Sequence, residues 1–262
     1  MTRLPTLFVS HGSPMLAVED SPARRFLQGL GADLPRPRAI LVASAHWESM
    51  REPAVSLASQ PETIHDFGGF PQVLYDLDYP APGAPQLAEK AALMLEQAGH
   101  TVGRSPHRGL DHGAWVPLKL MYPDADLPVS QLSILRGASP ANHERLGHAL
   151  AGLRDEGVLV IGSGSLTHNL YEFRGGPIDA PVPDWVSEFG GWMVDKLQAG
   201  DHEALRSYRS LAPSAARNHP TEEHLLPLFV AMGAAGEGAV AKRLHTSHEY
   251  GVLAMDVYAF GE

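Results

Sequence analysis

The feature that most constrains the fold is a set of short apolar segments, each followed by small residues and then a histidine. The run LFVS precedes His11, the run ILVASA precedes His46, and the run VLVIGSGSLT precedes His168. These segments are continuously apolar rather than alternating, and this pattern is typical of strands covered on both faces. We therefore expect several buried strands that end in polar side chains.

Strand-like and helix-like segments alternate along the chain, which predicts an α/β fold. The fold we expect is a single domain over residues 1–262, with a central mixed, largely parallel β-sheet flanked by helices. Strands are expected at Leu4–Ser10, Ala39–Ala45, Thr101–Arg104, Val129–Leu135, Val158–Gly162, Val240–Leu244 and Val252–Phe260. Helices are expected at Ala84–Ala98, from Ser139 to about Glu156, and at Pro183–Ala199, Asp201–Leu211 and Thr221–Ala231.

Composition narrows the function classes. The net charge is -10, and no basic cluster offsets it, so nucleic acid and anionic membranes are poor partners. The chain has no cysteine, which excludes disulfides, thiolate metal sites and thiol nucleophiles. The longest apolar stretches are too short to span a membrane, and the N-terminus lacks a signal-peptide pattern. We expect a cytoplasmic protein that is a monomer or a small homo-oligomer.

The histidines at the strand ends are candidates for a shared site. Ligands of open α/β sheets bind beyond the carboxyl ends of the strands, where His11, His46 and His168 are expected to meet. His224 follows Thr221, the expected N-cap of a helix, and would face the same edge from the first helical turn. Four imidazoles suit zinc, iron or copper. A single histidine at a strand end is more often a hydrogen-bonded loop residue than a ligand, and no HExxH spacing decides between the two interpretations.

Two other polar segments also allow two interpretations. Asp111, which precedes His112, is compatible with a helix N-cap and with an active-site acid or base. The Gly-rich aromatic segment 64–71 (IHDFGGFP) could turn the chain or line a pocket for a ring. The GSGS segment lacks the lysine of a phosphate loop and is not a nucleophile elbow. Six further histidines are expected at the surface or in loops: His100, His107, His143, His148, His202 and His219.

A series of motifs resembles one known family, the class III extradiol ring-cleavage dioxygenases, in the branch similar to 4,5-DOPA dioxygenase. The resemblance runs in matching order from about residue 5 to the C-terminus, so it covers nearly the whole chain. Each motif alone is weakly specific, whereas seven in order are strongly specific. The motifs are HGSPM at His11, SAHW at Ser44–Trp47, IHDFGGFP at Ile64–Pro71, YPAPG at Tyr79–Gly83, DHGAW at Asp111–Trp115, MYPDAD at Met121–Asp126 and TEEHLLPL at Thr221–Leu228.

The resemblance implies a metal set of His11, His46 and His224, with His168 at the metal as a further ligand or as the acid/base group. Many extradiol enzymes hold iron with two histidines and a carboxylate. Here the third position resembles His224, and the adjacent Glu223 is expected to point elsewhere. An all-nitrogen set leaves the double charge of the metal uncompensated until a catecholate binds. It would accept Zn²⁺ as well as the Fe(II) needed for activity.

The resemblance also assigns the substrate side of the site. His112 corresponds to a histidine that contacts substrate or shuttles a proton, and His65, Asp66 and Phe67 correspond to a substrate-side loop. The implied partners are a small catechol, DOPA-like, and O₂, and the implied reaction opens the ring next to the diol to a muconic semialdehyde. The negative net charge argues against strongly anionic substrates unless a local arginine offsets it.

Two alternative functions remain open at this point. A zinc hydrolase would use the same ligands to activate a hydroxide, and it would be active with Zn²⁺ without O₂. A non-catalytic metal-binding protein on the same scaffold is the other alternative. His112 and His168 argue against this second alternative, because a binding protein needs no proton shuttle.

Overall fold

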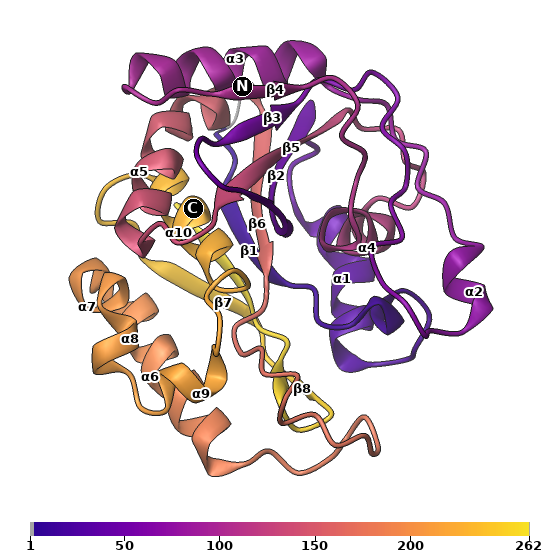
Figure 1. The fold of residues 1–262 in the computed structure, drawn as a ribbon, viewed down its shortest axis with the longest axis vertical. Coiled ribbons are helices and arrows are strands. Elements are labelled where there is room, and N and C mark those ends of the chain that lie inside the picture. The colour runs from indigo at the N-terminus through magenta and orange to yellow at the C-terminus, as the bar shows by residue number, and fades with distance from the viewer. Residues whose placement is uncertain (1–2, 262) are drawn as a thin grey trace.

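The fold is built around an eight-stranded mixed sheet in the computed structural model, which describes residues 3–261 (Figure 1). The strands of this sheet are β1 (Thr6–Ser10), β2 (Ala39–Ser49), β3 (Ala54–Ser56), β4 (Gly103–Ser105), β5 (Val129–Leu135), β6 (Val158–Gly164), β7 (Ala241–His245) and β10 (Val257–Phe260). Their order across the sheet is β4-β3-β5-β2-β6-β1-β10-β7. Strands β8 (His248–Glu249) and β9 (Leu253–Ala254) form a separate two-stranded sheet.

The middle of the sheet is parallel. Strands β5, β2, β6 and β1 run in the same direction, whereas β10 is antiparallel to both β1 and β7 and β3 is antiparallel to β5. Every residue of β1 and β6 is buried, because helices cover both faces of the sheet. The predicted fold class, an α/β fold with a mixed, largely parallel sheet flanked by helices, is confirmed.

The helices are divided between the two faces of the sheet. They are α1 (Pro22–Asp33), α2 (Gln72–Tyr75), α3 (Pro85–Gln97), α4 (His112–Met121), α5 (Pro140–Leu150), α6 (Asp184–Ala199), α7 (His202–Arg206), α8 (Tyr208–Leu211), α9 (Ala215–Asn218) and α10 (Leu226–Ala235), with short 3-10 helices η1 (Pro14–Ala17) and η2 (Ala151–Glu156). Helices α1 and α4 pack together on one face, and α3, α5 and α10 share an apolar core with the other (Figure 1). Helices α6–α9 extend this second layer over β10 and β7.

Several predicted boundaries were wrong. The helix predicted at Thr221–Ala231 begins only at Leu226, so residues 221–225 form a turn in front of α10. The helix predicted at Asp201–Leu211 is divided into α7 and α8 at Ser207, and the predicted strand Val252–Phe260 is divided into β9 and β10. Strand β2 continues four residues beyond the predicted Ala45. The shift of α10 matters most, because it moves His224 from a helical turn into an irregular one.

Two of the histidines expected at the surface or in loops are buried, His143 in α5 and His219 in a loop. His143 is 0% exposed; its Nε2 accepts from the Leu135 N–H at 3.0 Å and its Nδ1 lies 3.0 Å from the Ser139 carbonyl oxygen. His219 is also 0% exposed, with Nε2 2.9 Å from the Leu166 carbonyl oxygen. Backbone partners supplied by the fold make it possible to bury both imidazoles.

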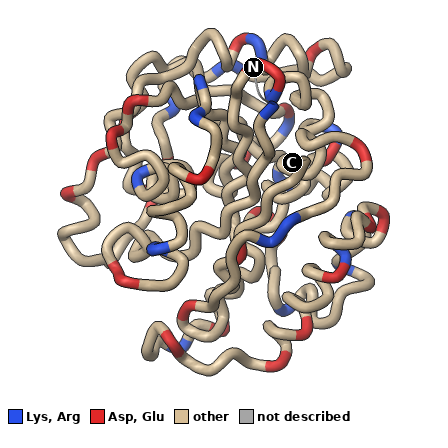
Figure 2. The backbone as a smooth tube through the Cα atoms, turned by 180° about the vertical axis from the view of Figure 1, so that it is seen from behind, with Lys and Arg blue, Asp and Glu red and all other residues tan. Residues whose placement is uncertain are grey.

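Acidic and basic residues are mixed over the molecule. Figure 2 shows the Lys and Arg positions spread among acidic ones rather than gathered on one segment. Over residues 3–261, no helix combines the length and apolarity needed to span a bilayer.

Candidate metal centre and active site

The parallel strands bring the predicted histidines to one edge of the sheet. Ser10 of β1 pairs with Gly164 of β6, and Ser44 of β2 lies beside Ser163, so the three strand ends are level. His11 follows β1 directly. On β2 the pairing with β5 shifts between Ser44 and Glu48, and this bulge contains His46. Bulges often re-aim side chains next to active sites, and here the bulge turns His46 toward His11.

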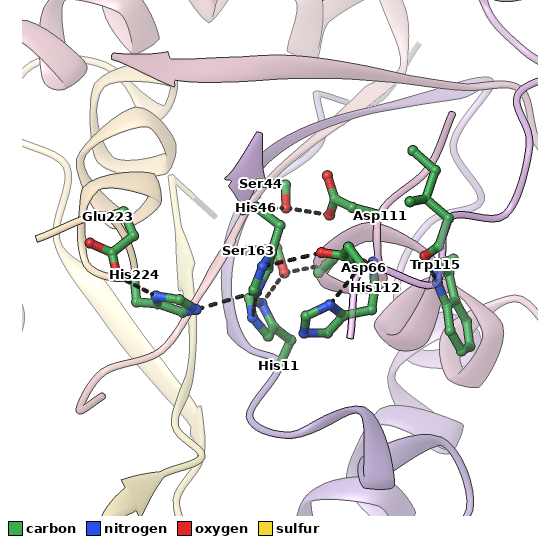
Figure 3. A network of polar contacts seen from close by, with 12 residues as sticks. His11, Ser44, His46, Asp66, Asp111, His112, Trp115, Ser163, Glu223 and His224 are labelled. Atoms are coloured by element: carbon green, nitrogen blue, oxygen red, sulfur yellow. Dashed lines mark hydrogen bonds and ion pairs between the residues drawn. The ribbon is translucent and has the colours of Figure 1, made fainter. Parts of the chain in front are cut away.

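Three imidazoles converge through their Nε2 atoms (Figure 3). His46 Nε2 lies 3.0 Å from His11 Nε2 and 3.3 Å from His224 Nε2. The ligand nitrogens of the three residues all lie within 4.8 Å of one another. Two nitrogens bound to one ion at about 2.1 Å each are separated by about 3.0–3.4 Å at octahedral or tetrahedral angles. The spacing therefore fits a first-row metal ion.

The opposite ring nitrogens, Nδ1, each face an oxygen. His11 Nδ1 lies 2.9 Å from Ser163 Oγ, His46 Nδ1 lies 3.3 Å from Asp66 Oδ2, and His224 Nδ1 lies 3.0 Å from Glu223 Oε1. The Ser163 hydroxyl donates to the Gly113 carbonyl, so its oxygen accepts from His11. These partners place the proton on Nδ1 and leave the Nε2 lone pair for a metal.

The charge state of the cluster also suits metal binding. Burial, reinforced by the neighbouring imidazoles, holds the pKa of His11 and His224 well below the usual value. Burial lowers the pKa of His46 to about 4, against the opposing charges of Asp111 and Asp66. The three rings are thus neutral near pH 7, and neutral imidazole is the form that binds metals.

His168 lies beside this cluster rather than inside it. Its ring stacks on that of His224 with centroids 3.5 Å apart and an interplanar angle of 9°. It belongs to a neighbouring group with Glu223 and His224, and burial lowers its pKa to about 4. His168 therefore lies next to the three converging imidazoles, and its role as a further ligand or as the acid/base group stays a prediction.

Asp66 links the group of His11, His46 and His224, here called the metal cluster, to His112. Its Oδ1 accepts from the His112 backbone N–H at 2.9 Å and lies 3.0 Å from His112 Nδ1, while Oδ2 faces His46. Burial opposes ionisation, but the hydrogen bonds and the proximity of His112 hold the pKa of Asp66 at about 2. A single ionised carboxylate therefore orients the imidazoles of both His46 and His112, as Figure 3 shows.

A cavity of about 350 Å³, here called the ring cavity, opens over the cluster. It is lined by Gly12, Ser13, Pro14, His46, Asp66, Phe67, Gly68, Phe70, His112, His168, Leu170, His224 and Leu253. Its apolar walls and imidazoles suit an aromatic ring that carries polar groups at one end. Of the predicted substrate loop, Asp66 and Phe67 line it. His65 does not, and its Nε2 lies 3.0 Å from the Leu77 carbonyl oxygen.

Two glycines make the close approach possible. Gly12 has φ +57°, and a Cβ there would lie 2.6 Å from the Met255 side chain. A Cβ on Gly113 would lie 2.6 Å from Ser44 Oγ and 3.1 Å from the His11 ring. Helix α4 therefore reaches the metal cluster only because its second residue has no side chain.

Sequence reasoning missed the buried network around Asp111. The Asp111 carboxylate, 0% exposed, accepts from Ser44 Oγ at 2.6 Å, from Arg108 at 2.6 Å and from Gln131 Nε2 at 2.7 Å. Asp111 occupies the predicted N-cap position of α4, but its carboxylate makes no side-chain cap there and does not line the ring cavity. Arg108 also donates to the His46 carbonyl oxygen at 3.2 Å, so the network fixes the bulge of β2 against α4.

Comparisons with known proteins agree with this site. Residues 5–260 match the family described as the catalytic LigB subunit of aromatic ring-opening dioxygenase. The chain is 45% identical to 4,5-DOPA dioxygenase extradiol from Beta vulgaris over 97% of this chain and 96% of that protein. It is 43% identical to the Escherichia coli K12 protein of the same name over 89% of this chain and 86% of that protein. The crystal structure of an uncharacterized E. coli K12 protein matches with a TM-score of 0.80 and 35% identity, covering 99% of this chain and 100% of that one.

The chain therefore belongs to the LigB family of aromatic ring-opening dioxygenases, and it is an extradiol ring-opening enzyme. Its nearly full-length similarity to the proteins of B. vulgaris and E. coli places it in the DOPA dioxygenase branch of the class III enzymes. The family is metal-dependent, in agreement with the cluster of imidazoles. The resemblance inferred from the motifs is confirmed.

Proposed function

We propose that this protein uses Fe(II) to open the ring of a DOPA-like catechol next to its diol, giving a muconic semialdehyde. The observation that carries the proposal is the convergence of three neutral imidazoles under a ring-sized apolar cavity with two further histidines in its wall. Both atoms of O₂ enter the product, so no external reductant is needed. The proposal assigns this activity to residues 1–262 as one catalytic domain.

His11, His46 and His224 would hold the metal. When bound, Fe(II) supplies Lewis acidity that lowers the pKa of the phenolic hydroxyls, together with the redox chemistry that O₂ requires. The three protein ligands carry no charge of their own. A doubly ionised diol therefore restores electrical balance at the site, which favours the catecholate over a neutral phenol. The same nitrogen set accepts Zn²⁺, so purified protein can carry zinc without turnover.

Two histidines would handle the protons of the diol. His112, held through Nδ1 by Asp66, lines the ring cavity and would take a phenolic proton. His168 lines the same cavity beside His224 and is neutral near pH 7, so it can also accept a proton and return it to the product. Asp66 fixes the tautomer of His112, and Glu223 lies near His168.

The walls of the ring cavity would position the substrate. The Phe67 ring packs edge-on against the His112 ring with centroids 5.7 Å apart, and edge-on against the Phe70 ring with centroids 5.4 Å apart. The aromatic loop therefore packs directly on the proposed acid/base group. Trp115 Nε1 donates to the Ile64 carbonyl oxygen at 3.0 Å and anchors this loop to α4. A ring bound among these side chains is shielded from water on one side.

The test is anaerobic reconstitution with Fe(II), followed by DOPA, 4-methylcatechol and related catechols with O₂. We expect O₂ uptake and a yellow semialdehyde, and we expect the zinc-loaded protein to be inactive. His46→Ala should lose metal and activity together, whereas exposed His107→Ala should lose neither. A colourless panel with iron bound, or ester hydrolysis by the zinc form without O₂, would overturn the proposal.

We further propose that the enzyme acts in the cytoplasm as a monomer or small homo-oligomer, with no nucleic-acid or membrane partner. The absence of cysteine and the scattered basic residues support this proposal. Fractionation of the native cells and light scattering of the purified protein test it.

A further inference from the structure

The ring cavity has one end at the imidazoles and another end that opens to solvent. The most exposed of the large apolar side chains in its lining is Leu170, which is 61% exposed. Phe67 and Phe70 are half-buried, and Leu253 is buried. The cavity therefore opens at Leu170. A catechol whose diol faces the imidazoles presents the opposite edge of its ring, and any substituent there, to this opening.

Leu170 belongs to an exposed apolar segment. Tyr171 and Phe173 are 81% and 42% exposed, and these two residues with Leu170 are here called the apolar rim. Phe173 packs edge-on against the Tyr250 ring with centroids 5.4 Å apart. Leu170 packs against none of the three apolar cores that the described residues form. Clustered exposed apolar side chains mark binding surfaces. Because Leu170 also lines the ring cavity, the occupant that fits this surface is a ligand of that cavity.

Hydrogen bonds hold the backbone of the apolar rim in place. Asn169, which is 6% exposed, donates through Nδ2 to the Arg217 carbonyl oxygen at 2.5 Å, and its Oδ1 accepts from the Tyr171 N–H at 3.0 Å. The Phe173 N–H donates to the Leu170 carbonyl oxygen at 3.3 Å. Leu170 is thus fixed at the opening before a ligand binds, and such pre-organisation lowers the entropic cost of binding.

The charged groups near the opening have partners within the protein. Glu172, between the rim residues, pairs with Arg217 at 2.9 Å and lies 3.8 Å from Arg174. Among the described residues that line the ring cavity there is no lysine or arginine, and the carboxylate of Asp66 is held between two imidazoles. A substituent at the opening therefore meets apolar surface, and the lining offers no cation to an acid group.

We propose that the enzyme prefers catechols with an uncharged, apolar substituent at the ring position opposite the diol, and that Leu170 is the residue that selects for it. The inference rests on the proposed function and narrows its substrate class. An alkyl chain at the opening would cover Leu170 and leave water, and each methylene buried in this way strengthens binding up to about fourfold. The charged end of a DOPA tail would stay in water beyond Leu170 and gain little.

The experiment measures kcat/KM of the wild-type iron enzyme for catechol, 4-methylcatechol, 4-ethylcatechol, 4-propylcatechol and DOPA. We expect kcat/KM to rise about two- to fourfold with each methylene, mainly through KM. The propyl chain has as many carbon atoms as the tail of DOPA but no charge, so 4-propylcatechol should be the better substrate of this pair. A flat alkyl series, or a preference for DOPA over 4-propylcatechol, would overturn the proposal.

Variants of Leu170 test the residue itself. Leu170→Ala should lower the ratio of kcat/KM for 4-propylcatechol to that for catechol about fivefold, and leave catechol within about twofold. Leu170→Met keeps an apolar side chain of similar size and should restore the ratio. Leu211→Ala is the matched control, because Leu211 of α8 is 56% exposed and lies outside the ring cavity. An unchanged ratio in Leu170→Ala would overturn the role of Leu170. If this variant changes only the oligomeric state, measured by light scattering, the rim is a contact between copies and the proposal fails.

Binding without turnover supplies a second readout. Calorimetry with the zinc-loaded protein under argon should show tighter binding and a more negative heat-capacity change for 4-propylcatechol than for catechol, because apolar surface is buried. Leu170→Ala should lose most of both differences, and equal values for the two ligands in the wild type would overturn the proposal. If the wild type turns over no catechol, the dioxygenase proposal fails by itself, and the calorimetric comparison still decides whether Leu170 binds the substituent.

Discussion

At the scale of single residues, the carboxylate of Asp66 is the group with the widest influence on the site. It faces Nδ1 of His46 and Nδ1 of His112 at once. Asp66→Asn replaces one acceptor oxygen by an amide that donates, so one imidazole must lose its partner. Loss of such a carboxylate partner costs about 10–100-fold in metal affinity or activity. We expect a loss of that size in both, measured by competition for zinc with a chelating dye and by O₂ uptake.

Asp76→Asn is the matched control for this change. Asp76 is an exposed carboxylate at the end of α2 that accepts from Gln72 Nε2 at 3.0 Å. Its substitution should leave metal affinity and rate within twofold. Retention of wild-type metal affinity and rate in Asp66→Asn would show that His46 and His112 need no orienting carboxylate.

The residue scale also shows what the sequence could predict. His11 and His46 follow recognisable apolar runs, so their meeting at one edge could be predicted from the α/β pattern. His143 and His219 follow no such pattern. Their burial depends on carbonyl and N–H groups that reach them only in the folded chain, so sequence reasoning placed them at the surface. The division of Asp66 between two imidazoles is likewise a product of tertiary structure.

At the scale of elements, helix α4 depends on Gly113 to approach the strands. A Cβ there would lie 3.0 Å from the His46 ring and 2.6 Å from Ser44 Oγ, and neither neighbour can retreat without disturbing the bulge. Alanine is otherwise favoured over glycine within a helix by about 1 kcal/mol. We therefore expect Gly113→Ala to fold but to bind metal at least tenfold more weakly, measured by zinc titration beside circular dichroism.

Gly190→Ala in α6 is the control that separates the gain in helix propensity from the steric clash of the added Cβ. A Cβ at Gly190 meets nothing within 4 Å, so this variant should gain the helix propensity and keep its metal affinity. Unchanged metal binding by Gly113→Ala would mean that the cluster tolerates displacement of α4.

The elements themselves were predicted to different extents. Helix α5 begins at Pro140 as expected, because Ser139 caps it by accepting from the Asn142 N–H. The same Ser-Pro signal precedes α1 at Ser21 and was overlooked, and β3 has only three residues, too few for a periodic pattern. The start of α10 was wrong because Thr221 and the acidic residues after it imitate a helix N-terminus. Their side chains instead bond to His224 and Tyr208.

At the scale of the whole molecule, the site is a product of strand order. Of the predicted ligands, His11 follows β1 and His46 lies on β2, and these strands are separated in the sheet by β6. His224 comes from the turn before α10. The sequence predicts that strands exist, but the order β2-β6-β1 depends on how the helical layers pack. A bound metal therefore joins three distant segments, and its contribution to stability grows with its free concentration.

His143 is buried in α5, away from the candidate site, and it makes the free energy of unfolding of the protein depend on pH. Burial lowers the pKa of His143 to about 4, from about 6.5 in an unfolded chain. The unfolded state therefore binds more protons between these values, and stability must fall as the pH drops below about 6.5. From pH 7 to pH 5 this single group should cost about 2 kcal/mol. The geometry gives the same sign, because a proton on Nε2 would face the Leu135 N–H that already donates to it.

Urea unfolding of the metal-free protein at pH 7 and pH 5 tests this expectation through a difference between variants. Burial raises the pKa of Asp256 to about 6, so that group gains stability on acidification and opposes His143. The wild-type curve alone mixes these two contributions with those of the other buried histidines, whose pKa values burial also lowers. His143→Gln should be less stable than the wild type at pH 7, yet lose about 2 kcal/mol less on going to pH 5. Exposed His107→Gln should show the same pH dependence as the wild type. Equal pH dependence in all three proteins would show that His143 is protonated at pH 5 in the folded state as well as in the unfolded state.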